Sequence, residues 1–130
     1  MSSVLLILNR RILGDTLIKT MKDSPQFQLH TEYEYDNAIS AAIAIQPVVA
    51  VLELSNAGEW TIQRCIELCD RLKEECYGIK ILVLCPEENK DACDSTVAAV
   101  QACRVDDFVF YDASRKYLIS KLESMTQNDG

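Results

Sequence analysis

Short apolar runs alternate with amphipathic segments along the whole chain, and this alternation restricts the possible folds more than any other feature. The runs have the length and the branched or aromatic content of β-strands, and they lie at residues 4–8, 27–33, 48–54, 79–84 and 107–111. The first, third and fourth runs are almost entirely apolar, as in strands that are covered on both faces. The run at 27–33 alternates with period two, which is typical of an edge strand.

The intervening segments carry apolar residues at helical spacing. We expect helices at about residues 12–22, 60–76 and 89–104, a shorter helix that follows Asp36 or Asn37 as its cap and stops before Pro47, and a last helix from Ser114 to about residue 125. On the helix at 89–104, we expect Cys93, Val97, Val100 and Cys103 to form the buried face. Parallel strands joined by helices form a sheet with helices on both faces, so the prediction is a three-layer α/β domain.

The chain has the size of a single domain. Its 130 residues can bury most of the surface that the unfolded chain exposes. We expect this domain to span residues 1–125, and residues 126–130 to be a flexible tail that resembles the start of a linker. Because no apolar stretch approaches the roughly 20 residues of a membrane span, and no basic segment precedes the first run, we expect a cytoplasmic protein without membrane attachment.

Charge and cysteine content argue against two classes of site. The net charge is −7, and the basic residues are scattered apart from Arg10 and Arg11, so we expect no direct contact with nucleic acid. The six cysteines, at positions 65, 69, 76, 85, 93 and 103, form no Cys-x-x-Cys pair, and His30 is the single histidine. A metal or redox site is therefore the less favoured interpretation of the cysteines.

Polar or reactive residues stand where the predicted strands end. Asn9 and Arg10 follow the first strand, Glu53 ends the third, Cys85 follows the fourth and Tyr111 ends the fifth. In open parallel sheets, ligands bind at the carboxyl ends of the strands. We therefore expect these five side chains to converge on one edge of the sheet.

The order and lengths of the elements resemble those of the receiver domain of two-component response regulators, over essentially the whole chain. Pro47 lies six residues before Glu53, as in that family, and Asp106, Asp107 and Phe108 resemble the usual entry into its fifth strand. The resemblance implies a flavodoxin-like (βα)5 fold with five parallel strands in the order 2-1-3-4-5. It also implies a role in two-component signal transduction, in a phosphorelay or in transcription regulation.

The chemical residues of the family are replaced in this sequence. The resemblance places the magnesium-binding acidic pair at Asn9 and Arg10, the phospho-accepting aspartate at Glu53, the hydroxyl residue at Cys85 and the lysine at Tyr111. Magnesium prefers carboxylate oxygens, and phosphoryl transfer needs both the metal and a cationic group. A glutamate also reaches roughly 1.5 Å further than an aspartate. We therefore expect a degenerate pseudo-receiver with no cofactor, no bound magnesium and no enzymatic activity.

Two residues of this pocket have more than one interpretation. Glu53 is either a fixed negative charge that partly imitates a phosphorylated aspartate, or a structural carboxylate paired with Arg10 or Arg11. Tyr111 either points inward and donates its hydroxyl to the acidic edge, or points outward toward a partner. Cys85 is expected to pack rather than react, since a thiol is a weak donor.

The resemblance also implies a protein-binding surface on the fourth helix, fifth strand and fifth helix, where receivers commonly form dimers. The candidate surface residues carry charges of both signs, and they are Lys90, Asp94, Gln101, Arg104, Arg115, Lys116 and Tyr117. Such a mixture suits a symmetric interface in which each copy supplies both signs.

The leading hypothesis is a non-phosphorylated receiver domain that regulates signal transduction or transcription through a protein partner or a homodimer. A C-terminal DNA-binding output domain would then lie outside this chain. One alternative is a phosphorylatable receiver with unusual chemistry. The other is a redox or metal sensor that uses some of the cysteines.

Overall fold

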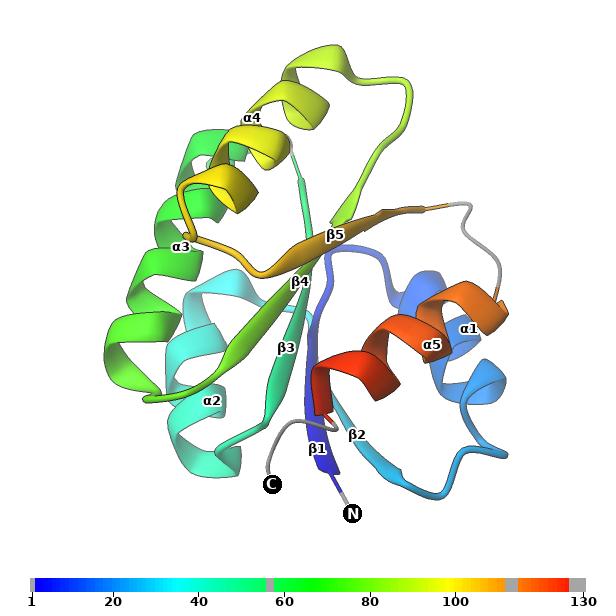
Figure 1. Ribbon diagram of the computed structural model, residues 1–130. Helices are drawn as coiled ribbons and strands as arrows, with labels where there is room; N and C mark the ends of the chain where they lie inside the picture. Colours follow the sequence, from blue (N-terminus) through cyan, green and yellow to red (C-terminus); the bar gives the residue numbers. More distant parts are fainter. Residues whose placement is uncertain (1, 56–57, 112–114, 127–130) are drawn as a thin grey trace.

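A computed structural model shows a parallel sheet covered by helices on both faces (Figure 1). It describes residues 2–55, 58–111 and 115–126, without the side chain of Arg115. The strands are β1 (Ser2–Ile7), β2 (Phe27–Glu32), β3 (Val49–Glu53), β4 (Lys80–Cys85) and β5 (Asp107–Phe110). The helices are α1 (Arg11–Thr20), α2 (Ala38–Ile45), α3 (Ile62–Glu75), α4 (Lys90–Gln101) and α5 (Arg115–Thr126), with a 3-10 turn at Tyr35–Asn37 before α2.

The strand order is β2-β1-β3-β4-β5, and every neighbouring pair is parallel. This confirms the predicted flavodoxin-like topology and the edge position of β2. In register, Leu6 of β1 lies opposite Val51 of β3, and Val51 lies opposite Leu82 of β4. The strand order reverses between β1 and β3, so the carboxyl ends of these two strands are the place where such a fold offers a site.

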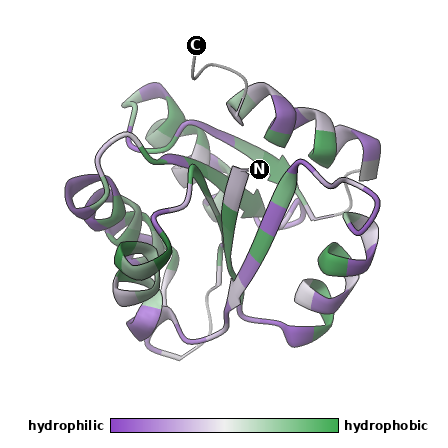
Figure 2. Cartoon of the chain, turned by 90° about the horizontal axis from the view of Figure 1, so that it is seen from below, coloured by the Kyte–Doolittle hydropathy of each residue, from purple (hydrophilic) through white to green (hydrophobic). Residues whose placement is uncertain are grey.

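Each face of the sheet has its own apolar core, because successive residues of a strand point to opposite faces. Leu5 and Ile7 of β1 pack with α2, α3 and α4, whereas Val4, Leu6 and Leu8 pack with α1 and α5. Figure 1 shows the same division of the helices, and Figure 2 shows apolar residues along the strands and the inner sides of the helices. The sheet is therefore packed between helices on both faces.

The buried face of α4 differs from the prediction. Ala92, Thr96 and Ala99 are buried, whereas Val97 and Cys103 are exposed. This alanine-rich helix carries two apolar stripes that are one residue apart, and the stripe of smaller side chains packs against the sheet. The buried Thr96 hydroxyl is satisfied because it donates to the Ala92 carbonyl at 2.7 Å. The helix also ends at Gln101, earlier than predicted, and Cys103 beyond it has a left-handed φ of 61°.

The helix starts agree with the prediction only in part. Asn89 caps α4, and its side chain accepts a hydrogen bond from the Ala92 N–H at 3.1 Å. Thr61 likewise caps α3 by accepting from the Arg64 N–H at 3.2 Å. Asn37 makes no such bond, because it belongs to the 3-10 turn that leads into α2 and lacks the extended backbone of a capping residue.

At the end of the chain, Leu118, Leu122 and Met125 form the inner face of α5. Thr126, assigned to the tail in the sequence analysis, belongs to this helix and donates its hydroxyl to the Leu122 carbonyl at 2.9 Å. The rest of that tail, residues 127–130, and Ser114, where this helix was expected to begin, lie outside the described residues. None of the helices in the described part of the chain is long and apolar enough to span a membrane.

Candidate functional site

The Glu53 carboxylate lies at the carboxyl end of β3 and is only 3% exposed. One oxygen, Oε1, accepts hydrogen bonds from the backbone N–H groups of Asn9 at 2.8 Å and Arg10 at 3.2 Å. The other oxygen, Oε2, accepts from the Arg10 Nε–H at 2.7 Å. Three donors thus surround one buried charge, which a carboxylate removed from water requires.

Arg10 is placed by the extended backbone that joins β1 to α1. Its guanidinium also lies over the Tyr111 ring, 4.6 Å from the centroid, and its side chain is 47% exposed to solvent. Arg11 does not contact Glu53 in this way, since its guanidinium lies over the Tyr33 ring at 4.6 Å. Of the two arginines considered for the ion pair, Arg10 therefore makes it.

Tyr111 points inward. Its hydroxyl donates to the Leu54 carbonyl at 2.6 Å, and its backbone N–H donates to the Cys85 carbonyl at 3.2 Å. Burial, together with the negative charge of Glu53, raises the pKa of Tyr111 well above its ordinary value. The neutral hydroxyl therefore holds the end of β5 against the segment that follows β3.

Tyr35 is part of the site although the sequence analysis did not select it. Its hydroxyl donates to the backbone carbonyl of Glu53, and its ring packs on Trp60 with 5.3 Å between centroids. Burial raises the pKa of Tyr35 far above the ordinary range, so this hydroxyl stays a donor. Its position just after the carboxyl end of β2 was the one available signal.

The sequence-predicted residues do not all meet in one place. Four of the five line a cavity of about 340 Å³, whose full lining is Asn9, Arg10, Glu53, Leu54, Ser55, Ile62, Pro86, Asn89 and Tyr111. Cys85 is fully buried and faces α4 instead, where its Sγ lies 3.7 Å from Cys93 Sγ and 3.8 Å from Thr96 Oγ1. Asn9 contributes its backbone N–H, which donates to Glu53 Oε1.

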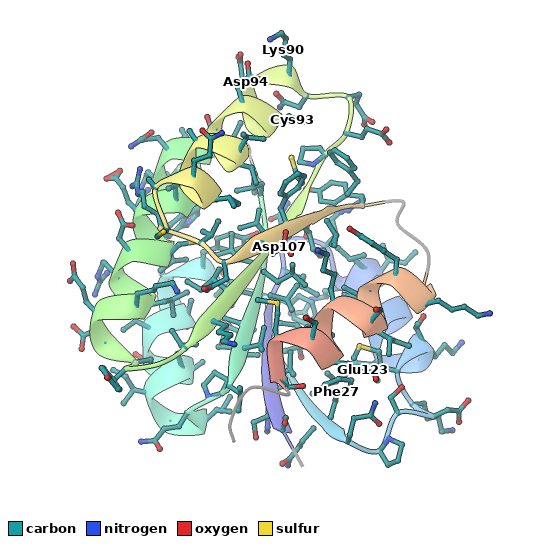
Figure 3. All side chains as sticks on the ribbon, in the orientation of Figure 1. Phe27, Lys90, Cys93, Asp94, Asp107 and Glu123 are labelled. Atoms are coloured by element: carbon teal, nitrogen blue, oxygen red, sulfur yellow. The ribbon has the colours of Figure 1, made fainter. Side chains whose placement is uncertain are left out.

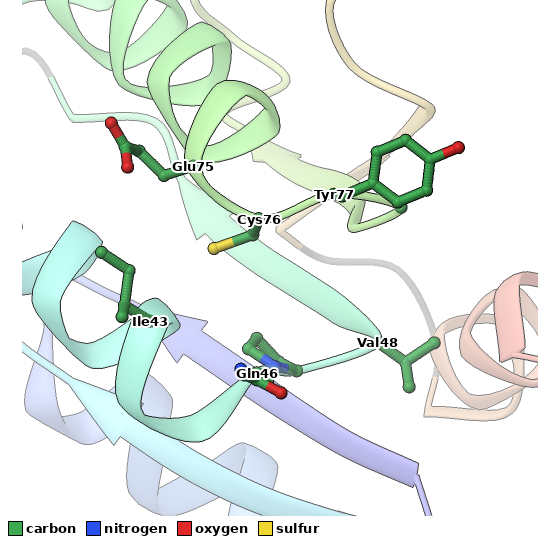
Figure 4. A pocket seen from close by; sticks show the side chains of 8 residues that line it. Ile43, Gln46, Val48, Glu75, Cys76 and Tyr77 are labelled. Carbon is green, nitrogen blue, oxygen red and sulfur yellow. The ribbon is translucent and has the colours of Figure 1, made fainter.

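A larger cavity of about 470 Å³ lies at the opposite edge, where β3 and β4 begin (Figure 4). Ile43, Gln46 and Cys76 are among its lining residues. None of the five residues selected at the strand ends lies there, so this cavity is separate from the Glu53 site.

The residues around Glu53 do not fit a magnesium ion. Magnesium requires a near-octahedral set of oxygen ligands, but here the two carboxylate oxygens face N–H donors and a guanidinium. Within the described residues, no group of three or more His, Cys, Asp or Glu side chains is arranged to hold a metal ion. The charge of the Glu53 carboxylate is therefore offset by the Arg10 guanidinium and not by a metal ion.

Most of the candidate surface residues on α4 and α5 are exposed. Lys90 and Asp94 form an exposed ion pair at 3.1 Å on the first turns of α4 (Figure 3), and the exposed members of the predicted set also include Gln101, Lys116 and Tyr117. Arg104 was assigned to this surface, but it forms two hydrogen bonds with Asp70 of α3, at 2.7 and 3.1 Å. The side chain of Arg115 lies outside the described residues.

Comparison with known proteins identifies the fold. No family model matches the chain, and no curated protein matches it significantly. Among solved structures, a two-component response regulator from Clostridium difficile superposes with a TM-score of 0.80 at 15% identity, covering 98% of each chain. A LuxR-family DNA-binding response regulator from Staphylococcus aureus (TM-score 0.76, 15% identity) and the chemotaxis protein CheY4 of Vibrio cholerae (TM-score 0.76, 14% identity) each cover 96% of this chain and 98% of their own.

The chain has the fold of a response-regulator receiver domain. At identities of 15% or less, these similarities show the fold of the chain but not the chemical role of its pocket residues.

Proposed function

We propose that this chain is a receiver-like regulatory domain that is not phosphorylated and that acts through contacts with protein partners. The observation that supports it best is the state of Glu53, whose two carboxylate oxygens accept hydrogen bonds from Asn9 and Arg10. A carboxylate that is engaged in this way is a poor nucleophile.

Phosphoryl transfer depends on groups that neutralise charge on the moving oxygens. In this pocket the positive charge belongs to Arg10, and it is bound to Glu53 itself at 2.7 Å. Tyr111 stands where the family has its lysine, and its hydroxyl is held by the Leu54 carbonyl. A phosphoryl donor would have to displace the arginine from a buried carboxylate and would meet no metal ligand set.

The ion pair also supports a structural role for Glu53 over imitation of a phosphorylated aspartate. A phosphoryl group carries about 1.5 to 2 negative charges, whereas Glu53 carries one, and the Arg10 guanidinium offsets it. The pocket therefore presents little net charge to a partner. Its proposed role is to hold the β1, β3 and β5 ends in one fixed arrangement.

The proposed protein contacts lie on α4, β5 and α5. This surface carries the exposed Lys90–Asp94 pair on α4 and the half-exposed ring of Tyr117 on α5. Lys121 of α5 bonds to Asp107 of β5 at 2.5 Å, which ties the two elements together. We propose that a second copy or another protein binds here, and that a DNA-binding output domain, where one exists, is a separate unit.

Incubation with a small acyl phosphate and magnesium, followed by intact-mass measurement, tests the absence of phosphorylation. We expect the mass to stay unchanged, because Glu53 is already paired with Arg10. A receiver domain with the complete set of acidic residues and lysine serves as the positive control in the same buffer.

A stable mass gain of one phosphoryl group that Glu53→Gln abolishes would show a phosphorylatable receiver and contradict the proposal. A gain that persists in Glu53→Gln would place the phosphoryl group on another residue, which also contradicts the absence of phosphorylation but leaves the pairing of Glu53 with Arg10 unchanged. The Arg10→Met variant separates two causes, the pairing of Glu53 with Arg10 and the missing metal ligands. In this variant the carboxylate is free of the guanidinium, and we still expect no mass gain, because the metal ligands are missing.

A further inference from the structure

Two cysteines from different elements touch each other beside the Glu53 site. Cys85 ends β4 and Cys93 lies in the first turn of α4 (Figure 3), and their Sγ atoms are 3.7 Å apart. Both are free thiols. A sulfur–sulfur distance of this size is a van der Waals contact, and no side chain separates the two atoms.

The two cysteine residues differ in their exposure to solvent. Cys85 is fully buried, and the Thr96 hydroxyl lies 3.8 Å from its sulfur. Cys93 is partly exposed, and its sulfur lies near the carbonyl oxygens of Pro86 at 3.6 Å and Glu87 at 3.7 Å. Cys93 is therefore the more accessible of the two residues to an oxidant from solvent, and its sulfur is in contact with that of Cys85.

We propose that Cys85 and Cys93 are a reversible oxidation site that takes a hydroperoxide and forms an intramolecular disulfide. First, the Cys93 thiolate attacks the distal peroxide oxygen, the O–O bond breaks, and Cys93 becomes a sulfenic acid while the peroxide leaves as hydroxide or alkoxide. Then the Cys85 sulfur attacks the Cys93 sulfur, the S–O bond breaks, and the sulfenic oxygen leaves as water after taking the Cys85 proton.

The distances allow the second step with a small movement. The sulfurs must approach from 3.7 Å to about 2.05 Å, which a side-chain rotation of the partly exposed Cys93 can supply along with an adjustment of the short connection at residues 86–89. Cys85 cannot move as freely, because its backbone belongs to the sheet and its carbonyl accepts the Tyr111 N–H at 3.2 Å.

The disulfide would bind the first turn of α4 to the end of β4. In the thiol form, this turn is held near the sheet by the Asn89 cap and by the buried Ala92 and Thr96. A covalent bond between Cys85 and Cys93 adds a constraint at the point where α4 begins. The oxidised form therefore opens its first turn less often than the reduced form.

The experiment treats the full chain with a low dose of hydrogen peroxide, blocks the remaining thiols with an alkylating reagent, and maps the unreduced peptides by mass spectrometry. A Cys103→Ser chain is used beside the wild type, because the exposed Cys103 can join two chains. We expect a mass loss of about 2 Da per chain, one cross-linked peptide pair that contains Cys85 and Cys93, and full reversal by dithiothreitol.

Two variants identify the sulfurs. With Cys93→Ser, which alters a partly exposed position, Cys85 is expected to remain a thiol after the same treatment. With Cys85→Ser, Cys93 is expected to pass to the sulfinic acid, since the second thiol is missing. The buried Cys65 and Cys69, one turn apart on α3, are the internal control and are expected to stay reduced.

Three results would overturn the proposal. The first is Cys93 as a sulfinic acid in the wild-type chain while Cys85 is alkylated. The second is alkylation of both residues at peroxide doses that oxidise Cys103. The third is cross-linking of Cys65 with Cys69 to the same extent as Cys85 with Cys93. Amide hydrogen exchange tests the constraint on α4, and equal exchange at residues 90–94 in the reduced and oxidised chains would count against it.

Discussion

At the scale of single residues, the site depends on how one buried carboxylate is satisfied. Glu53 is stable in the interior because backbone N–H groups from Asn9 and Arg10 and the Arg10 guanidinium all donate to it. The sequence indicated the ion pair as one of two interpretations and offered two arginines for it. It did not indicate Tyr35, whose hydroxyl donates to the Glu53 carbonyl from a position 18 residues away in the chain.

Arg10→Met is expected to lower the free energy of unfolding by about 1–2 kcal/mol. The carboxylate keeps its two backbone donors, and the side chain of Arg10 is half-exposed, so water replaces part of the lost interaction. Urea denaturation measures the change, and a double-mutant cycle with Glu53→Gln gives the coupling between the two side chains.

Arg11→Met is the matched control, since that arginine lies over Tyr33 and not on Glu53. We expect the cycle of Arg11→Met with Glu53→Gln to show coupling below about 0.5 kcal/mol. Equal coupling for the two arginines would contradict the assignment of the ion pair to Arg10.

At the scale of elements, the sequence predicted the existence of α4 but not which of its faces is buried. Its existence and its start near residue 89 follow from a local signal, namely the helical period of its apolar residues. The capping role of Asn89 is seen only in the structure. Its buried face did not follow, because the stripe at Cys93, Val97 and Val100 and the stripe of smaller residues have the same period. Packing against the sheet decides which stripe is buried, and α4 packs there through Ala92 and Ala99.

Asn89→Ala is expected to destabilise the protein by about 1 kcal/mol, because the Ala92 N–H loses its acceptor at the start of α4. The same substitution at Asn37 is expected to cost less than about 0.5 kcal/mol, since Asn37 makes no side-chain capping bond. Thermal or urea unfolding of the two variants gives the comparison. Equal losses at both positions would mean that the cap of α4 contributes little.

At the scale of the whole molecule, the helices hold the sheet from both faces and leave its carboxyl edge and the α4–β5–α5 surface to solvent. The order β2-β1-β3-β4-β5 brings the ends of β1 and β3 together, which is why residues 9 and 53 meet. The same order leaves β5 at one edge, between α4 and α5. The proposed partner surface therefore needs no rearrangement of the core.

Self-association through that surface is expected to weaken with Tyr117→Glu, which places a charge on an exposed aromatic ring of α5. Light scattering over a concentration series should show the dissociation constant for the dimer rising at least about tenfold, equivalent to roughly 1.4 kcal/mol. Tyr77→Glu is the control, because Tyr77 is a fully exposed tyrosine at the opposite edge of the sheet.

A wild-type chain that stays monomeric at high concentration would count against a homodimer and leave a different protein as the partner. Equal weakening by Tyr77→Glu and Tyr117→Glu would mean that the added charge acts through the net charge of the chain, and not through the α4–β5–α5 surface.

The sequence by itself determined the class of fold, the positions of the strands and helices to within a few residues, and the residues that stand at the strand ends. These features follow from the spacing of apolar and polar residues along short segments, which is a local property of the chain. The tertiary structure alone decided that Arg10 rather than Arg11 binds Glu53, that Tyr35 supports it, that Arg104 pairs with Asp70, and that Cys85 faces Cys93. Those choices depend on distances of a few ångströms between atoms of separate elements, and only the packing of helices against a twisted sheet sets such distances.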